Sequence, residues 1–226
     1  IWGSIVNDSR SWTRQLLEFS DCGDHLNETD PVIRRMAIRQ AAWCYALGRN
    51  LRGQNPLKDL AGLSSAEEIE SWRASQNVPN EILLCQAKEL RALYNEKQLE
   101  LYQFVELERT LTRLTDSMGA CERIKNTPFP QSYSRMVDGM IYSFALFVPF
   151  GLVKVPAVGL VLTAVAIPFG FLVIEKVEDY LQDPFSNRPS DTPMLTLSRT
   201  IEINIKQMLG ETNLPSKLEP LDGVYY

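Results

Sequence analysis

The sequence lacks most of the features that identify a metal centre or a catalytic site. It contains a single histidine, His25, and four widely spaced cysteines, Cys22, Cys44, Cys85 and Cys121, with no CxxC pair among them. Zinc fingers, thioredoxin-like redox sites and Ser-His-Asp triads need partners that this composition does not supply. We therefore predict no catalytic residues and no enzymatic activity, and we interpret the cysteines as small buried hydrophobic residues.

The sequence also has no excess of positive charge and no recognisable strand. Its formal net charge is −5 over 226 residues, whereas a nucleic-acid-binding protein usually carries a basic patch. We predict no nucleic-acid partner. No segment alternates apolar and polar residues as a half-buried strand does, and there is no internal repeat. The sequence therefore predicts an all-α protein.

Helical patterns with defined ends account for most of the chain. Apolar residues recur at spacings of three and four, and side chains suited to capping stand before several of these runs. The predicted helices cover about 1–20, 31–51, 65–74, 79–93, 97–118 and 193–209. The expected caps are Thr29 or Asp30 before Pro31, Ser65 paired with Glu68, and Asp191 or Thr192 before Pro193, with Gly210 ending the last helix.

One segment is almost free of charge. Residues 139–174 contain one charged residue, Lys154, which separates uncharged runs of 14 residues (140–153) and 20 residues (155–174). A helix needs about 20 mostly apolar residues to cross a bilayer core. The second run reaches this length, and the first reaches it when neighbouring residues are included. We predict a transmembrane helical hairpin at 127–175, a cytosolic helical region at 1–126, and a cytosolic acidic segment, helix and tail at 176–226.

The distribution of Lys and Arg predicts the orientation of this hairpin. Cations favour the cytoplasmic side of a membrane. Arg113, Arg123, Lys125 and Arg135 precede the hairpin, Lys176 and Arg188 follow it, and Lys154 lies in its turn. We therefore predict a multi-pass protein of the cell membrane, with both ends of the hairpin in the cytoplasm and its turn outside.

The segment CERIKNTPFP (121–130) stands at the entry to the hairpin. A residue before proline disfavours the helical region. Pro128 and Pro130 therefore predict that the preceding helix ends at about Asn126, so that the chain changes direction before it enters lipid. The alternative is an ordinary loop between soluble helices.

These motifs give the sequence a resemblance to a known family. WGSIVNDSRSW, CERIKNTPFP, FVPFG, an acidic segment ending in DPF, and RTIEINI occur in this order, and over essentially its whole length the chain resembles the bestrophin-like ion channels, especially their bacterial members. The resemblance implies a homo-pentamer around one pore, with four membrane helices per subunit. It also implies that the first two of these helices, including the one with the narrow apolar neck, precede WGSIVNDSRSW.

The resemblance further implies a second constriction of the pore at its cytosolic end, on the helix before CERIKNTPFP. The nearest positions are Tyr102 and Gln103, although the family pattern expects a branched aliphatic residue there. Five tyrosines around an axis could narrow a pore and offer hydroxyls to ions. The alternative is that Tyr102 packs between helices.

The acidic stretch EKVEDYLQDPF is a second candidate for contact with ions. Its carboxylates could make a vestibule that favours cations, or could be a solvated helix end; they are Glu175, Glu178, Asp179 and Asp183. Animal relatives hold calcium with a run of acids after the DPF-like motif, but here SNRPSD follows. We expect no calcium clasp and no cofactor.

A series of arginines could also affect whether the vestibule favours anions or cations. Such a series could favour anions in a vestibule, but we interpret it as a solvated face or as salt bridges between helices. Its members are Arg34, Arg35, Arg39, Arg49 and Arg52.

The function that we predict is passive conduction of small monovalent ions, chloride or sodium, across the membrane. Bacterial relatives of this kind can conduct cations and animal relatives conduct anions, so the resemblance leaves the selectivity open, as it does the gating stimulus. One alternative is a helical bundle of the soluble pore-forming type, which would be water-soluble before insertion. Another is a membrane-anchored scaffold without conductance.

Overall fold

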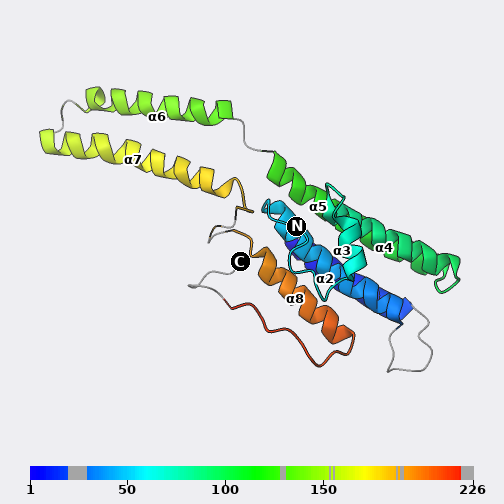
Figure 1. Cartoon of the computed structure of the whole chain (residues 1–226). Coiled ribbons are helices and arrows are strands. Elements are labelled where there is room, and N and C mark those ends of the chain that lie inside the picture. Colours follow the sequence, from blue (N-terminus) through cyan, green and yellow to red (C-terminus); the bar gives the residue numbers. More distant parts are fainter. Residues whose placement is uncertain are drawn as a thin grey trace. The chain divides into compact units, whose positions relative to one another are not determined.

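The structure is a computed structural model, and it describes residues 1–19, 30–127, 131–152, 154, 156–186, 188 and 191–219, with the backbone alone at 131 and 178–181. The regular elements in this part of the chain are all helices (Figure 1), as the sequence predicts. They are α1 (Trp2–Phe19), α2 (Pro31–Leu51), α3 (Ala66–Trp72), α4 (Val78–Asn95), α5 (Leu101–Asn126), α6 (Gln131–Gly151), α7 (Ala157–Leu181) and α8 (Met194–Met208).

Two of the helix starts follow the predicted caps. The Asp30 carboxylate accepts a hydrogen bond from the Val32 N–H at 2.7 Å, and Pro31 occupies the first turn of α2. Ser65 and Glu68 form both hydrogen bonds of a capping box, each at 3.2 Å. These side chains satisfy N–H groups that have no partner within the helix, so the local sequence fixes where α2 and α3 begin.

The start of α8 differs from the prediction. Neither Asp191 nor Thr192 caps this helix; Pro193 takes the capping position, without a side-chain hydrogen bond. The Asp191 carboxylate instead accepts a hydrogen bond from the Arg188 N–H at 2.8 Å. The Asp191 side chain, which was predicted to cap α8, therefore forms a hydrogen bond within the preceding loop instead. The other end is as predicted, because Gly210 adopts φ +75° and closes the helix.

Residues 1–123 and 185–226 form one compact unit, in which α2 is the central helix. Most of α2 is buried, including Trp43, Cys44 and Leu47, because α1, α4 and α8 all pack on it. At Gly48 an added Cβ would lie 3.2 Å from Cβ of Met194, so the glycine allows α2 and α8 to approach closely. The bundle therefore has an apolar core of its own.

The long helix α5 packs on this unit through buried apolar residues, polar contacts and one aromatic contact. The Thr110 hydroxyl donates to Gln15 of α1 at 2.7 Å, and Arg113 donates to Asp8 of α1 at 2.8 Å. The rings of Tyr94 in α4 and Phe104 lie 4.9 Å apart. The apolar stripe that α5 contributes to the core consists of Leu107, Leu111, Leu114, Met118 and Cys121.

The cysteines that the structure describes are free thiols. Cys44 and Cys121 are buried and Cys85 is half-buried. Burial raises the pKa of Cys44 to about 12 and that of Cys121 to about 11. This confirms, for Cys44 and Cys121, the interpretation as buried hydrophobic residues; Cys22 and His25 lie outside the described residues.

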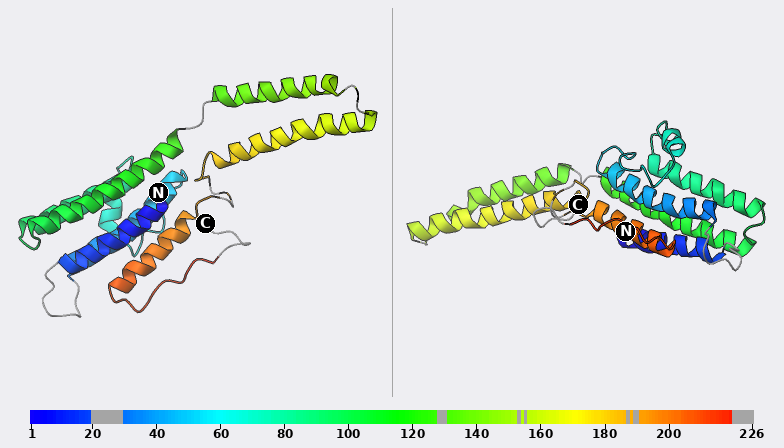
Figure 2. Two further views of the ribbon diagram at one scale, coloured as in Figure 1. Left: turned by 180° about the vertical axis from the view of Figure 1, so that it is seen from behind. Right: turned by 60° about the horizontal axis from the view of Figure 1, so that its bottom comes forward.

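Residues 124–184 form a second unit, a hairpin of α6 and α7 that lie side by side (Figures 1 and 2). Ile141 is buried within it, and the rings of Phe144 and Phe171 meet edge to face with centroids 5.9 Å apart. The α7 helix runs on to Leu181, past the predicted boundary at 175.

Candidate functional site

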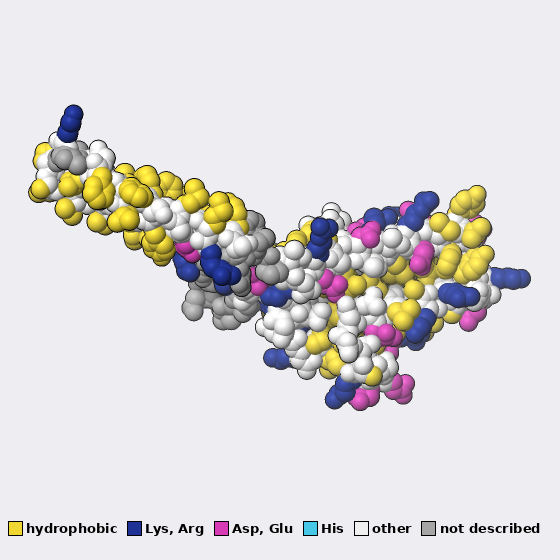
Figure 3. All heavy atoms as spheres, turned by 90° about the horizontal axis from the view of Figure 1, so that it is seen from above, with side chains coloured by type: hydrophobic (Ala, Val, Ile, Leu, Met, Phe, Trp, Pro, Cys, Tyr) yellow, Lys and Arg dark blue, Asp and Glu magenta, His cyan; other side chains and the backbone are white. Residues whose placement is uncertain are grey.

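The surface of the hairpin is apolar on nearly every side. Residues 157–177 of α7 form a helix that is long and apolar enough to cross a membrane, and almost none of them is buried. Figure 3 shows hydrophobic side chains gathered over α6 and α7, and acidic and basic ones over the bundle. The large exposed side chains include Met140, Phe147, Phe150, Val158, Leu162, Val165, Phe169 and Ile174. A soluble monomer rarely exposes so extensive an apolar patch, whereas lipid is a suitable environment for it.

The two helices are not equally apolar. In the part of the chain that the structure describes, α7 is the one helix that meets the length and composition of a membrane span. The first turns of α6 carry Arg135 and Asp138, which lower its apolar content. That α6 also crosses the membrane therefore stays a prediction.

An ion pair connects the segments that enter and leave the hairpin. Lys125 lies in the last turn of α5, and Asp183 lies just after α7. The Lys125 Nζ donates to Asp183 at 2.7 Å, and each side chain is about one-third exposed, at 32% and 34%. Both residues lie in motifs that carry the resemblance, CERIKNTPFP and DPF, but no feature of the sequence indicates that they are partners 58 residues apart.

This ion pair involves Asp183, one of the four carboxylates that were candidates for a cation site. Calcium takes about six to eight oxygen ligands. In the described residues no three Asp, Glu, His or Cys side chains are grouped as metal ligands, and the carboxylate of Asp183 already binds an ammonium group. Glu175 is half-buried in α7, and the side chains of Glu178 and Asp179 lie outside the description. That this stretch holds no calcium therefore stays a prediction.

The predicted constriction lies in the first turn of α5. Tyr102 is 86% exposed, so it is not packed between helices of this chain. The Gln103 side chain accepts a hydrogen bond from the Glu100 N–H at 2.8 Å, which fixes the start of the helix. Of the two candidates, only Tyr102 has a side chain free to face a pore or a neighbouring subunit.

Of the predicted break before the membrane, the structure describes the end of the preceding helix. The α5 helix ends at Asn126, as the prolines predict. Pro128 and Pro130 themselves lie outside the described residues.

The arginine series forms contacts within the bundle, and for Arg35 and Arg39 these are the predicted salt bridges between helices. Four of the five arginines pair with carboxylates, and Arg52 donates to the Thr192 carbonyl at 3.4 Å. The pairs are Arg34 with Glu211, Arg35 with Glu89, Arg39 with Glu68 and Glu89, and Arg49 with Asp59. Arg39 is the most buried, and its side chain is 2% exposed.

Because Lys125 and Asp183 are both partly exposed, we expect their ion pair to contribute less than about 1 kcal/mol to stability. A double-mutant cycle of Lys125→Met and Asp183→Asn, followed by thermal unfolding of the purified protein, measures this coupling. A coupling of several kcal/mol would show instead that the pair is desolvated in the assembled protein.

Comparison with known proteins identifies the family. A family model described as "Bacterial/Fungal Bestrophin protein" matches residues 1–207. The "Voltage-dependent anion channel-forming protein RSc3414" of Ralstonia nicotianae is 30% identical over 214 residues, which are 95% of this chain and 69% of that protein. The "Voltage-dependent anion channel-forming protein YneE" of Escherichia coli K12 is 28% identical over 220 residues, 97% of this chain and 70% of that protein.

Solved structures agree with the sequence comparison. The crystal structure of a bacterial bestrophin homologue from Klebsiella pneumoniae superposes with a TM-score of 0.82 at 28% identity, covering 94% of this chain and 77% of that one. Sequence and fold both match over nearly the whole chain. This chain belongs to the bacterial and fungal bestrophin family.

Proposed function

We propose that this protein is the subunit of an anion channel in the cell membrane. The observation that carries the proposal is the exposed apolar hairpin of α6 and α7, in a chain whose relatives are named as voltage-dependent anion channel-forming proteins. Conduction of this kind needs no covalent chemistry, because ions move down their gradient through a pore.

In this proposal α6 and α7 both cross the bilayer and the helical bundle is cytoplasmic. The cations on both sides of the hairpin support this orientation, since they favour the cytoplasmic face. Pro149 and Pro168 lie inside the two helices, and proline is tolerated in membrane helices because neighbouring helices satisfy the backbone groups that it frees.

A single hairpin cannot enclose a pore, so the proposal includes a ring of subunits. Closed symmetric assembly is the usual form of homo-oligomers, and the resemblance to bestrophin-like channels favours five copies. The exposed Tyr102 at the start of α5 is our candidate for the cytosolic constriction. Its phenol would narrow the path and offer a hydroxyl to a passing ion.

Planar bilayer recording of the full-length protein under a tenfold sodium chloride gradient tests this function. We expect current that reverses near the chloride equilibrium potential, about 59 mV from zero for a monovalent ion. Reversal at the opposite sign would show sodium selectivity and contradict the anion proposal. Silence in all salts and voltages would instead favour a membrane-anchored scaffold.

A further inference from the structure

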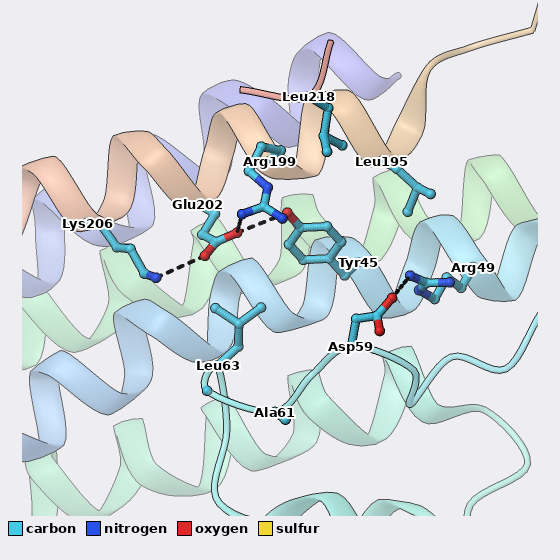
Figure 4. Close-up of a pocket in the computed structure, with 11 residues that line it drawn as sticks. Tyr45, Arg49, Asp59, Ala61, Leu63, Leu195, Arg199, Glu202, Lys206 and Leu218 are labelled. Carbon is cyan, nitrogen blue, oxygen red and sulfur yellow. Dashed lines mark hydrogen bonds and ion pairs between the residues drawn. The ribbon is translucent and has the colours of Figure 1, made fainter. Parts of the chain in front are cut away.

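The helical bundle contains a cavity that ion conduction does not explain. It lies between α2, α8, residues 59–63 and the C-terminal tail, and has a volume of about 360 Å³ (Figure 4). All of its walls belong to the compact unit of 1–123 and 185–226. Its volume is within the range of small-molecule sites, about 300–1,000 Å³.

One wall of the cavity is a charged cluster around Glu202 (Figure 4). The Glu202 carboxylate is 5% exposed and accepts the Tyr45 hydroxyl at 2.9 Å. Lys206 pairs with it at 2.9 Å and Arg199 at 3.4 Å. Burial is the main cause that raises the pKa of Tyr45, so its hydroxyl remains a donor. This carboxylate is already neutralised by two cations.

A second ion pair, Arg49 with Asp59, lies on another wall. The carboxylate of Asp59 is 61% exposed, whereas the Arg49 side chain is 9% exposed. The cavity is thus lined by three cations and two carboxylates, which leaves one positive charge in excess. The Arg49 and Arg199 side chains both line the cavity, and they are 9% and 28% exposed. A charge-assisted hydrogen bond to a carboxylate is among the stronger ones, so an anion in the cavity would be stabilised by these two guanidinium groups.

The remaining wall is apolar and includes a part of the tail. Leu63 and Leu195 line it, and Leu218 reaches it from the tail. A ligand that matches these walls carries a single negative charge and a short hydrocarbon portion.

We propose that this cavity binds a small organic monocarboxylate. The carboxylate lies between the guanidinium groups of Arg49 and Arg199, and the hydrocarbon portion lies against Leu195 and Leu218. At about 30 Å³ per water, the cavity holds a molecule of six carbons with room to spare. The inference is independent of channel activity, since every residue that it uses lies in the bundle.

Isothermal titration of the full-length protein in detergent with hexanoate tests the proposal, with hexanamide as the neutral analogue. We expect saturable binding of hexanoate and none of hexanamide. Arg49→Gln removes the charged donor and should weaken hexanoate binding about tenfold or more, while Arg91→Gln, an exposed arginine outside the cavity, should leave it unchanged. Partition into the micelle is the same for all variants and does not distinguish them.

A change in the tail gives a second test that does not alter the helices. Leu218→Asp would add a carboxylate to the apolar wall and should abolish hexanoate binding, whereas the neutral Leu218→Asn should retain most of it. Equal binding of hexanoate and hexanamide, equal binding to Leu218→Asp and Leu218→Asn, or no binding of hexanoate at all would overturn the proposal.

Discussion

Replacement of Arg39 by methionine should destabilise the helical bundle by about 3–5 kcal/mol. The Arg39 side chain is almost wholly buried and donates to Glu89 at 2.7 Å, to Glu68, and to Gln86 at 3.3 Å. Methionine fills a similar space but leaves two partly buried carboxylates without their main partner. Chemical or thermal unfolding of the full-length protein in one detergent measures the loss.

The matched control is Arg35→Met. Arg35 pairs with the same carboxylate, Glu89, at 2.7 Å, but its side chain is 46% exposed. We expect a loss below about 1 kcal/mol, as for other exposed ion pairs. Equal losses for the two variants would show that burial of the guanidinium does not determine the strength of this cluster.

The pH dependence of the stability of Arg39→Met separates the contribution of charge from that of packing. Burial favours the neutral form of Glu89, but hydrogen bonds and charge from Arg39 and then Arg35 hold its pKa below the usual value. A lowered pKa stabilises the fold above the unfolded value of about 4.3, and this stabilisation is lost as the pH falls through the folded pKa. The difference between wild type and Arg39→Met should therefore shrink in acid. A difference that stays constant would indicate lost packing.

Replacement of Val165 by lysine should prevent stable insertion of the hairpin. Val165 lies near the middle of α7 and is 63% exposed. A lysine at the centre of a membrane helix costs about 2.5–3.5 kcal/mol on insertion scales. We expect loss of the protein from alkaline-washed membranes and loss of channel current.

Two variants control for effects unrelated to lipid. Val165→Leu keeps the surface apolar and should insert normally. Leu84→Lys places the same charge on α4 of the bundle, at a residue 43% exposed, and should leave membrane association intact. If Val165→Lys remained in the membrane with normal current, this face of α7 would not contact lipid.

The sequence predicts best those features that depend on neighbouring residues. The start of α2 at Asp30 and the end of α5 at Asn126 follow from side chains and prolines within a few positions. The cap of α8 was predicted wrongly, although Asp191 suits a cap, because the Arg188 N–H competes for the same carboxylate. Which of two nearby N–H groups a carboxylate binds cannot be decided from composition alone.

Partners that are distant in the chain could not be predicted. The arginines of α2 suggested salt bridges, but Arg34 pairs with Glu211 across 177 positions and Arg39 with Glu68 across 29. The pair of Lys125 and Asp183 was missed for the same reason. The packing of helices decides which of many carboxylates each cation meets.

The orientation of the hairpin can be measured directly at Lys154, which is exposed in its turn. Lys154→Cys in the full-length protein should react with a membrane-impermeant maleimide added to intact cells, while Arg73→Cys on the bundle should react only after permeabilisation. This result would place the turn outside the cell and the bundle inside. Protection of both Lys154→Cys and Arg73→Cys until the cells are permeabilised would contradict a membrane-crossing hairpin, and with it the channel that we propose.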